Sequence, residues 1–219
     1  KVDGIICVTY QDVEPYVSEN IPLISLDRHF HKKVSCISSD NYHGGELAAQ
    51  KMISTGSRHL LYLRNGSEIS GETLKRGKGF KRYCDAHGVF CETLNLGDDF
   101  DLIRGKTSVE EVLRNFIISA RKTGKMRYDG IYTSTDLLAK ALLEQLQFLG
   151  VEVPEEVQLV GHDGIQWMNS GKYLVSTIVQ PVPDMARKSV ELLLKKIKGE
   201  EIETLTILPV KFAEGGTTR

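Results

Sequence analysis

The sequence predicts an α/β protein whose strands form parallel sheets, and three observations indicate this class. Short apolar runs alternate with amphipathic stretches of about 10–16 residues. Glycines follow three of these stretches, at positions 56, 88 and 150, where a helix C-terminus favours a residue with positive φ. No repeat, low-complexity tract or Pro/Gly-rich linker interrupts the alternation. Such a chain builds βαβ units, which place their strands in parallel.

The apolar runs are expected to form strands, with a weakly helical link at 11–20 between the first two. In chain order the expected strands are 4–9, 22–26, 34–38, 59–63, 89–96, 130–134, 157–161, 175–179 and 205–212. Most of these runs are bounded by glycine, proline or polar residues, which is typical of strands that end in loops.

Five stretches have the spacing of helices. In chain order they are 43–55, 72–87, 107–122, 136–149 and 184–197. Leu47, Ala48 and Met52 form one face of the first, and Val112, Phe116 and Ile117 belong to one face of the third. Gly44-Gly45 opens the first helix without a Gly-x-Gly-x-x-Gly or a Gly-Lys-Ser/Thr signature. The glycine pair therefore indicates close helix packing, and nucleotide binding is not expected.

Composition narrows the classes of function. The chain has 219 residues, enough for two lobes, and its 28 basic and 29 acidic residues give a net charge of -1. These residues show no electrostatic footprint for nucleic acid, and no apolar run approaches the roughly 18–20 residues of a membrane span. The four cysteines lack Cys-x-x-Cys spacing, so reduced thiols in a cytoplasmic protein are expected. We expect no metal and no cofactor.

Asp163 follows the apolar run 157–161, between His162 and Gly164. In open α/β sheets, ligands bind beyond the carboxyl ends of the strands, and a carboxylate there accepts hydrogen bonds from hydroxyl or amine groups. The alternative is that Asp163 caps the next turn, and the residues alone leave both interpretations open. Polar and aromatic candidates also stand near other strand ends: Asn65, Arg76, Phe100, Thr135, Asp136, Trp167 and Gln180. Each has a local alternative; Asp136, for instance, suits the N-cap of its helix.

Catalytic signatures are weak. No Gly-x-Ser-x-Gly is present, and no Cys/His dyad can be read from spacing. His29 and His31 stand one residue apart among basic residues, which favours a solvated loop over a metal site. Asp98, Asp99 and Asp101 favour an acidic loop over a hydrolase carboxylate cluster. We therefore expect a protein that binds its ligand without turning it over.

An ordered set of motifs runs along the chain. It comprises Val2–Ile6, Ile21–Arg28, Ser39–Gly45, Ile53–Gly56, Arg76–Phe80, Tyr128–Tyr132, Thr135–Ala139, Gly150–Val157, Leu159–Ile165, Ser176–Pro181, Leu208–Val210 and Gly216–Thr218. Together these runs resemble the LacI/GalR family of bacterial sugar-responsive transcription regulators. Within it, the Asp27-Arg-His-Phe-His31 run and the Glu214-Gly-Gly-Thr-Thr218 ending look most like sucrose or ribose operon regulators.

The resemblance implies a periplasmic-binding-protein-like fold with two parallel-sheet lobes joined by three crossovers and the ligand in the cleft. It implies an N-terminal lobe of residues 1–56 plus 182–199 and a C-terminal lobe of 57–179 plus 203–219. The chain opens abruptly in a strand. We therefore expect a fragment with a truncated N-terminal lobe and no DNA-binding headpiece.

The resemblance also implies roles for residues of the effector site. Arg76 matches an arginine that hydrogen-bonds effector hydroxyls, and Asp163 matches the acid that accepts from the sugar. Phe100 lies near the family's stacking aromatic, and Gln180 lies at a crossover that lines the cleft. Thr135 departs from the usual asparagine, and His162 replaces a common aromatic residue. Asp136 and Trp167 complete the expected effector-binding set.

The implied function is the sugar-binding and dimerisation part of a cytoplasmic transcriptional repressor. Its partners would be a small sugar or sugar phosphate, operator DNA through the missing headpiece, and a second copy of the chain, without a membrane. The alternative is a periplasmic sugar-binding protein that feeds a transporter. A sugar-processing enzyme is a third option, but no acid/base pair is placed for one.

Overall fold

The chain forms two units in the computed structural model, which describes residues 2–9, 13–18, 20–30, 34–65, 71–97, 109–122, 124–167 and 170–219. Unit 1 consists of Lys1–Asp40 and Pro181–Val210, and unit 2 of Asn41–Gln180 and Lys211–Arg219. The chain passes from one unit to the other at three points, after residues 40, 180 and 210, in agreement with the three expected crossovers.

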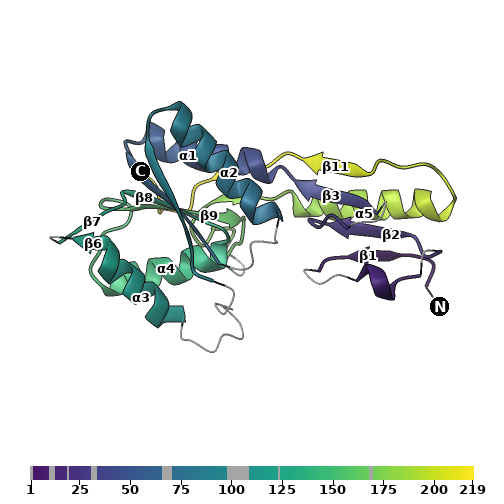
Figure 1. The fold of residues 1–219 in the computed structure, drawn as a ribbon, viewed down its shortest axis with the longest axis horizontal. Coiled ribbons are helices and arrows are strands. Elements are labelled where there is room, and N and C mark those ends of the chain that lie inside the picture. Colours follow the sequence, from purple (N-terminus) through teal and green to yellow (C-terminus); the bar gives the residue numbers. More distant parts are fainter. Residues whose placement is uncertain are drawn as a thin grey trace. The chain divides into compact units, whose positions relative to one another are not determined.

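Unit 1 is a parallel sheet with one helix packed on it. The strands are β1 (Ile5–Cys7), β2 (Leu23–Leu26), β3 (Ser35–Ser39) and β11 (Leu205–Leu208), in that spatial order, and the 3-10 helix η1 (Glu14–Tyr16) follows β1. Helix α5 (Val182–Ile197) lies along the strands of this sheet (Figure 1). Its Met185 and Leu192 pack with Ile24 of β2 and Ile37 of β3. This small apolar cluster is the core of unit 1.

Unit 2 is built on a six-stranded sheet. The spatial order is β12 (Lys211–Ala213), β10 (Ser176–Val179), β9 (Gln158–Asp163), β8 (Gly130–Thr133), β4 (His59–Arg64) and β5 (Phe90–Asn95). Five of these strands are parallel, and only β12 pairs antiparallel. The carboxyl ends of the parallel strands therefore meet at one edge of the sheet.

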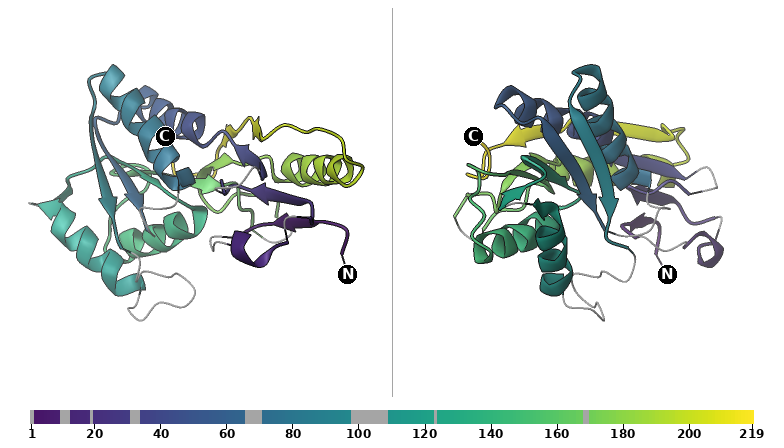
Figure 2. Two further views of the ribbon diagram at one scale, coloured as in Figure 1. Left: turned by 45° about the vertical axis from the view of Figure 1, so that its right-hand side comes forward. Right: turned by 60° about the vertical axis from the view of Figure 1, so that its left-hand side comes forward.

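Helices cover both faces of this sheet, as two views show (Figures 1 and 2). Helices α1 (Asn41–Ser54) and α2 (Gly71–Ala86) lie on one face, and α3 (Val109–Ala120) and α4 (Asp136–Phe148) on the other. Successive side chains of a strand alternate between the faces. Leu61 and Leu63 of β4 join the core under α3 and α4, whereas Tyr62 packs beside Phe80 of α2. A short antiparallel pair, β6 (Arg121–Lys122) with β7 (Lys125–Met126), follows α3 and was not expected.

The close helix packing predicted from Gly44-Gly45 is confirmed for Gly45. A Cβ built on Gly45 lies 2.0 Å from the backbone oxygen of Arg76 in α2, and one built on Gly79 of α2 lies 1.9 Å from the backbone oxygen of Tyr42 in α1. Two backbones approach this closely only where side chains are absent. The glycines thus fix the distance between α1 and α2.

The C-terminal part of the chain differs from the prediction. The stretch 205–212 was expected to be one strand of the second lobe, but β11 belongs to unit 1 and β12 to unit 2. Pro209 separates them. Proline has no N–H for a strand ladder and holds φ near −65°, which explains why the apolar run breaks there.

The unit boundary also lies elsewhere than expected. Helix α1 was assigned to the N-terminal lobe, with a boundary at residue 56, but it packs on α2 and belongs to unit 2. Strand β9 continues to Asp163 beyond the expected end at Gly161, because its pairing with β10 extends to that residue. Among the residues that the structure describes, no helix is both long and apolar enough to cross a membrane.

Candidate functional site

Polar side chains gather at the carboxyl ends of three neighbouring strands of unit 2. Strand β9 ends at Asp163, β8 is followed by Ser134, and β10 is followed by Gln180. Helix α2 adds Arg76 to this group. In open parallel sheets, ligands bind just beyond the carboxyl ends of the strands, which is where this group of side chains lies.

Arg76 is almost completely buried, with 6% of its side chain exposed, and is held from three sides. Its Nε donates to Asn41 Oδ1 at 2.6 Å, and its Nη1 donates to the backbone oxygen of Ser134 at 2.5 Å. Nη1 also lies 3.5 Å from Asp163 Oδ1, which forms an ion pair between the two expected effector residues. These contacts lock the planar guanidinium in one orientation.

Asn41 and Glu72 support Arg76, and the sequence reasoning assigned a role to neither. Asn41 Nδ2 donates to Glu72 Oε2 at 2.7 Å, which directs the amide oxygen of Asn41 toward Arg76. Lys75 Nζ lies 2.7 Å from Glu72 Oε1. Asn41 belongs to the Ser39–Gly45 motif, which follows an expected strand. Its partner Arg76 is 35 residues away, and no local sequence pattern indicates a contact at that separation.

Asp163 has an uncommon backbone conformation, with φ of 125° at a residue other than glycine. Its carboxylate Oδ1 accepts from Gln180 Nε2 at 2.7 Å, and its backbone oxygen accepts from the N–H of Gln180 at 3.3 Å. About 27% of its side chain is exposed. Asp163 therefore presents a partly open carboxylate at the end of β9.

Asp136 is fully buried and holds the turn that follows Asp163. Its Oδ2 accepts from the N–H groups of Gly164 at 2.8 Å and Ile165 at 2.6 Å, and its Oδ1 accepts from Thr177 Oγ1 at 2.6 Å. The expectation that Asp136 caps α4 is wrong, because Thr135 is the N-cap and accepts from the N–H of Leu138 at 3.2 Å. With no exposed surface, Asp136 supports the site from beneath.

Burial raises the pKa of Asp136 to about 6, and the nearby charge of Asp163 acts in the same direction, against the three hydrogen bonds. Between pH 4 and 6 the folded protein therefore binds more protons than the unfolded chain, so the free energy of unfolding falls as the pH rises through this window. From pH 4.5 to 7 the contribution is about 2 kcal/mol, at about 1.4 kcal/mol per pH unit.

Asp136→Asn removes this titration and keeps an oxygen for the Gly164 and Ile165 amides. We expect urea unfolding at pH 4.5 and 7 to show a smaller loss of stability with pH in the variant than in the unmodified protein, by about 2 kcal/mol. Equal pH dependence in the two proteins would contradict the assignment.

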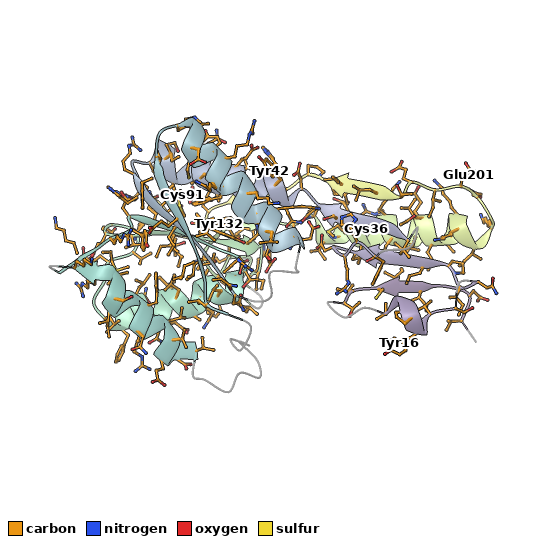
Figure 3. The ribbon with its side chains drawn as sticks, in the orientation of Figure 1. Tyr16, Cys36, Tyr42, Cys91, Tyr132 and Glu201 are labelled. Carbon is orange, nitrogen blue, oxygen red and sulfur yellow. The ribbon has the colours of Figure 1, made fainter. Side chains whose placement is uncertain are left out.

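His162 is buried beside the site and faces the opposite way from Asp163 along β9. Its Nδ1 is 2.6 Å from the hydroxyl of Tyr132, the residue labelled on β8 in Figure 3. Burial, and secondly the positive charge of Arg76, hold the pKa of His162 well below its usual value, so the ring is neutral. The Tyr132 ring packs against the rings of Tyr62 and Phe80, with centroids 5.2 and 5.1 Å away.

The other expected site residues are less closely assembled. The hydroxyl oxygen of Thr135 serves α4 as its cap. Trp167 is 49% exposed, four residues past Asp163, with Lys140 Nζ 5.6 Å from its ring. Phe100 lies outside the described residues. The structure thus brings together Arg76, Asp163 and Gln180, and effector contacts by the other expected residues remain predictions.

The described part of the chain contains no group of three or more His, Cys, Asp or Glu residues that could hold a metal ion. Cys7, Cys36, Cys84 and Cys91 are free thiols, in keeping with the reduced cysteines expected from their spacing.

Residues 49–218 match the family model for the periplasmic binding protein-like domain. The chain belongs to this family. Its fold of mostly parallel sheets, and the resemblance to LacI-type regulators drawn from the motifs, are confirmed by the relatives. The chain is 28% identical to the sucrose operon repressor of Streptococcus mutans, over 98% of this chain and 63% of that protein. It is 30% identical to the ribose operon repressor of Bacillus subtilis, over 100% of this chain and 64% of that protein.

A solved structure extends the comparison. A periplasmic binding protein/LacI transcriptional regulator from Alkaliphilus metalliredigens, in complex with D-xylulofuranose, is 28% identical to this chain. The match covers 100% of this chain and 78% of that one, with a TM-score of 0.75. The chain thus spans less than two thirds of the length of the curated repressors and matches a sugar-bound relative along its whole length.

Proposed function

We propose that this chain is the effector-binding part of a sugar-responsive transcriptional repressor. The observation that carries the proposal is the Arg76–Asp163 pair at the carboxyl ends of the unit 2 strands, in a chain whose relatives are sugar-operon repressors. In this proposal the protein acts in the cytoplasm, pairs with a second copy, and contacts operator DNA through a segment outside these 219 residues. Sugar binding changes its affinity for the operator.

A neutral sugar fits the pair better than a sugar phosphate. The guanidinium of Arg76 supplies hydrogen-bond donors and the carboxylate of Asp163 supplies acceptors, and a sugar hydroxyl can serve either. Asp163 Oδ1 lies 3.5 Å from Arg76 Nη1, so its negative charge offsets the attraction that the arginine alone would have for a phosphate. One relative was solved in complex with D-xylulofuranose, so we propose pentoses and pentuloses as the first sugars to test.

Thermal unfolding with D-ribose, D-xylulose, sucrose or D-ribose 5-phosphate tests the proposal. A sugar at 100 times its Kd adds about 2.7 kcal/mol to the free energy of unfolding and raises Tm by several degrees. L-Ribose is the matched control, because it has the same composition and the opposite configuration. The proposal fails if none of the four compounds raises Tm above the L-ribose control.

Operator binding by the full-length protein separates regulation from transport. We expect fluorescence anisotropy on the upstream DNA of its own operon to show tight binding that the stabilising sugar weakens at least tenfold. A coupling of this size corresponds to about 1.4 kcal/mol. A protein that binds the sugar but no DNA would fit the alternative, a sugar-binding component of a transporter.

A further inference from the structure

Two of the four cysteines lie together at the outer strand of the unit 2 sheet. Cys84 is on the last turn of α2, and Cys91 is on β5, the last strand of this sheet in the described part of the chain. Cys84 is fully buried, whereas Cys91, which is labelled in Figure 3, is partly exposed. One of the two thiols is therefore shielded from solvent, and the other is accessible to small molecules.

A tight turn leads the chain from Cys84 back toward Cys91. The backbone oxygen of Cys84 accepts from the N–H of Val89 at 3.0 Å, and that of Asp85 accepts from the N–H of Gly88 at 3.2 Å. Gly88 has φ of 66°, so α2 ends in a Schellman motif with glycine in the left-handed conformation. The end of the helix thus leads directly into β5, and the two cysteines stand on either side of one fixed turn.

The strand register turns the Cys91 side chain toward α2. Cys91 pairs with Leu60 of β4 in a parallel ladder, and side chains of paired residues lie on the same face of a sheet. Tyr62, two residues further along β4 and therefore on that face, packs beside Phe80 of α2. The Cys91 thiol thus lies on the face that α2 covers, where Cys84 is buried.

The two thiols form a hydrogen bond and differ in character. This bond, together with burial, raises the pKa of Cys84, so Cys84 keeps its proton. The same bond lowers the pKa of Cys91; burial opposes the effect, and the positive charge of Lys81 reinforces it against the carboxylates of Asp85 and Glu92. As a thiol, Cys91 also donates to the backbone oxygen of Glu92 at 3.7 Å. Because the thiolate is the nucleophilic form, Cys91 is the reactive member of the pair.

We propose that Cys84 and Cys91 are a reversible redox pair that a hydroperoxide oxidises to a disulfide. The inference is independent of the proposed function, because neither thiol belongs to the Arg76–Asp163 site. The disulfide ties the C-terminal end of α2, the helix that carries Arg76, to the outer strand of the sheet. Where thiols are kept reduced, disulfides of this kind are transient and report on oxidants.

The reaction has two steps. The Cys91 thiolate attacks one oxygen of the hydroperoxide, the O–O bond breaks, and Cys91 becomes a sulfenic acid while the leaving oxygen takes a proton. The sulfur of Cys84 then attacks the sulfur of Cys91, the S–O bond breaks, and the hydroxyl leaves as water with the proton of Cys84. The two thiols lose two electrons, which reduce the hydroperoxide. A dithiol returns the pair to the reduced form by thiol–disulfide exchange.

Peptide mapping of the unmodified full-length protein tests the pair. The reduced protein is treated with hydrogen peroxide, digested with chymotrypsin without reduction, and analysed by mass spectrometry. Phe90 lies between the two cysteines, so chymotrypsin separates them into two peptides that only a disulfide holds together. We expect a linked peptide with Cys84 and Cys91 that dithiothreitol separates, and loss of two of the four free thiols. Absence of this link, or a link through Cys7 or Cys36 in its place, overturns the inference.

Two serine variants test the order of the steps. Cys84→Ser keeps a hydroxyl donor for Cys91 but cannot close the disulfide, so the Cys91 sulfenic acid should accumulate and react with dimedone. We expect this labelling to be at least about tenfold faster than labelling of Cys7, a partly exposed thiol whose pKa burial raises. In Cys91→Ser the buried Cys84 should stay unlabelled.

Cys7→Ser is the matched control and should form the Cys84–Cys91 link as the unmodified protein does. Equal labelling of Cys7 and Cys91, or labelling of Cys84 in Cys91→Ser, would show that Cys91 is not the reactive member. The link in the unmodified protein decides the pairing even where a variant fails to fold.

Discussion

Replacing Arg76 by Met is expected to lower sugar affinity at least about 100-fold and to destabilise unit 2 by about 3–5 kcal/mol. Methionine fills much of the same volume but has no donor for Asn41 Oδ1 or the Ser134 backbone oxygen, both of which accept from Arg76. Removing one member of a buried charged network leaves its partners poorly compensated. In the proposed site the guanidinium also donates to sugar hydroxyls, and loss of two such bonds, at about 1.5–3 kcal/mol each, exceeds the roughly 2.7 kcal/mol of a 100-fold change in affinity.

Calorimetric titration and urea unfolding measure the two effects. Arg82→Met is the matched control, because Arg82 lies on the same helix, its side chain is 68% exposed, and its ion pair with Glu46 is on the surface. We expect that variant to stay within about 0.5 kcal/mol of the unmodified protein. Full sugar affinity in Arg76→Met would remove Arg76 from the site.

Gly79→Ala is expected to destabilise the protein by about 3 kcal/mol. The added Cβ would lie 1.9 Å from the backbone oxygen of Tyr42, and a backbone atom of a packed helix has little freedom to move. Helices α1 and α2 must therefore separate. Since α1 begins with Asn41 and α2 carries Arg76, we expect weaker sugar binding as well.

Gly71→Ala controls for the loss of glycine in the same helix. A Cβ at Gly71, the first residue of α2, meets nothing within 4 Å. Alanine favours helix over glycine by up to about 1 kcal/mol, so this variant should be as stable as the unmodified protein or slightly more stable. Urea midpoints measured for Gly79→Ala and Gly71→Ala test this difference, and we expect the midpoint of Gly79→Ala to be clearly lower. Similar midpoints would mean that the contact between α1 and α2 is not tight.

The sequence was sufficient for the order of most elements and for two residues of the candidate site. Alternating apolar and amphipathic stretches are local signals, and they correctly indicated parallel sheets with helices at about the observed residues. Gly45 was correctly interpreted as a packing residue, because its position at a helix start without a phosphate-loop signature left that explanation. Arg76 and Asp163 came from motif resemblance, and the structure places them 3.5 Å apart.

Local sequence patterns did not predict which unit or sheet an element joins, because that depends on contacts with segments distant in the sequence. Helix α1 has the same local pattern whichever unit it joins, and the contact of Gly45 and Gly79 with the opposite backbone decides in favour of unit 2. The apolar run 205–212 satisfied the strand pattern throughout, although Pro209 divides it between two sheets. A local pattern shows that a segment is extended, but it does not show which sheet the segment joins.

By itself, then, the sequence determined the α/β class, and its motif resemblance singled out Arg76 and Asp163, which the structure brings together at the strand ends. Only the tertiary structure decided how that pair is held. Asn41 is 35 residues from Arg76, and Asp136 is 41 residues from Thr177, so no spacing rule connects them. Burial then gives these contacts their effect, because hydrogen bonds shielded from water orient side chains more firmly than exposed ones. Burial itself raises the pKa of Asp136 against its three hydrogen bonds.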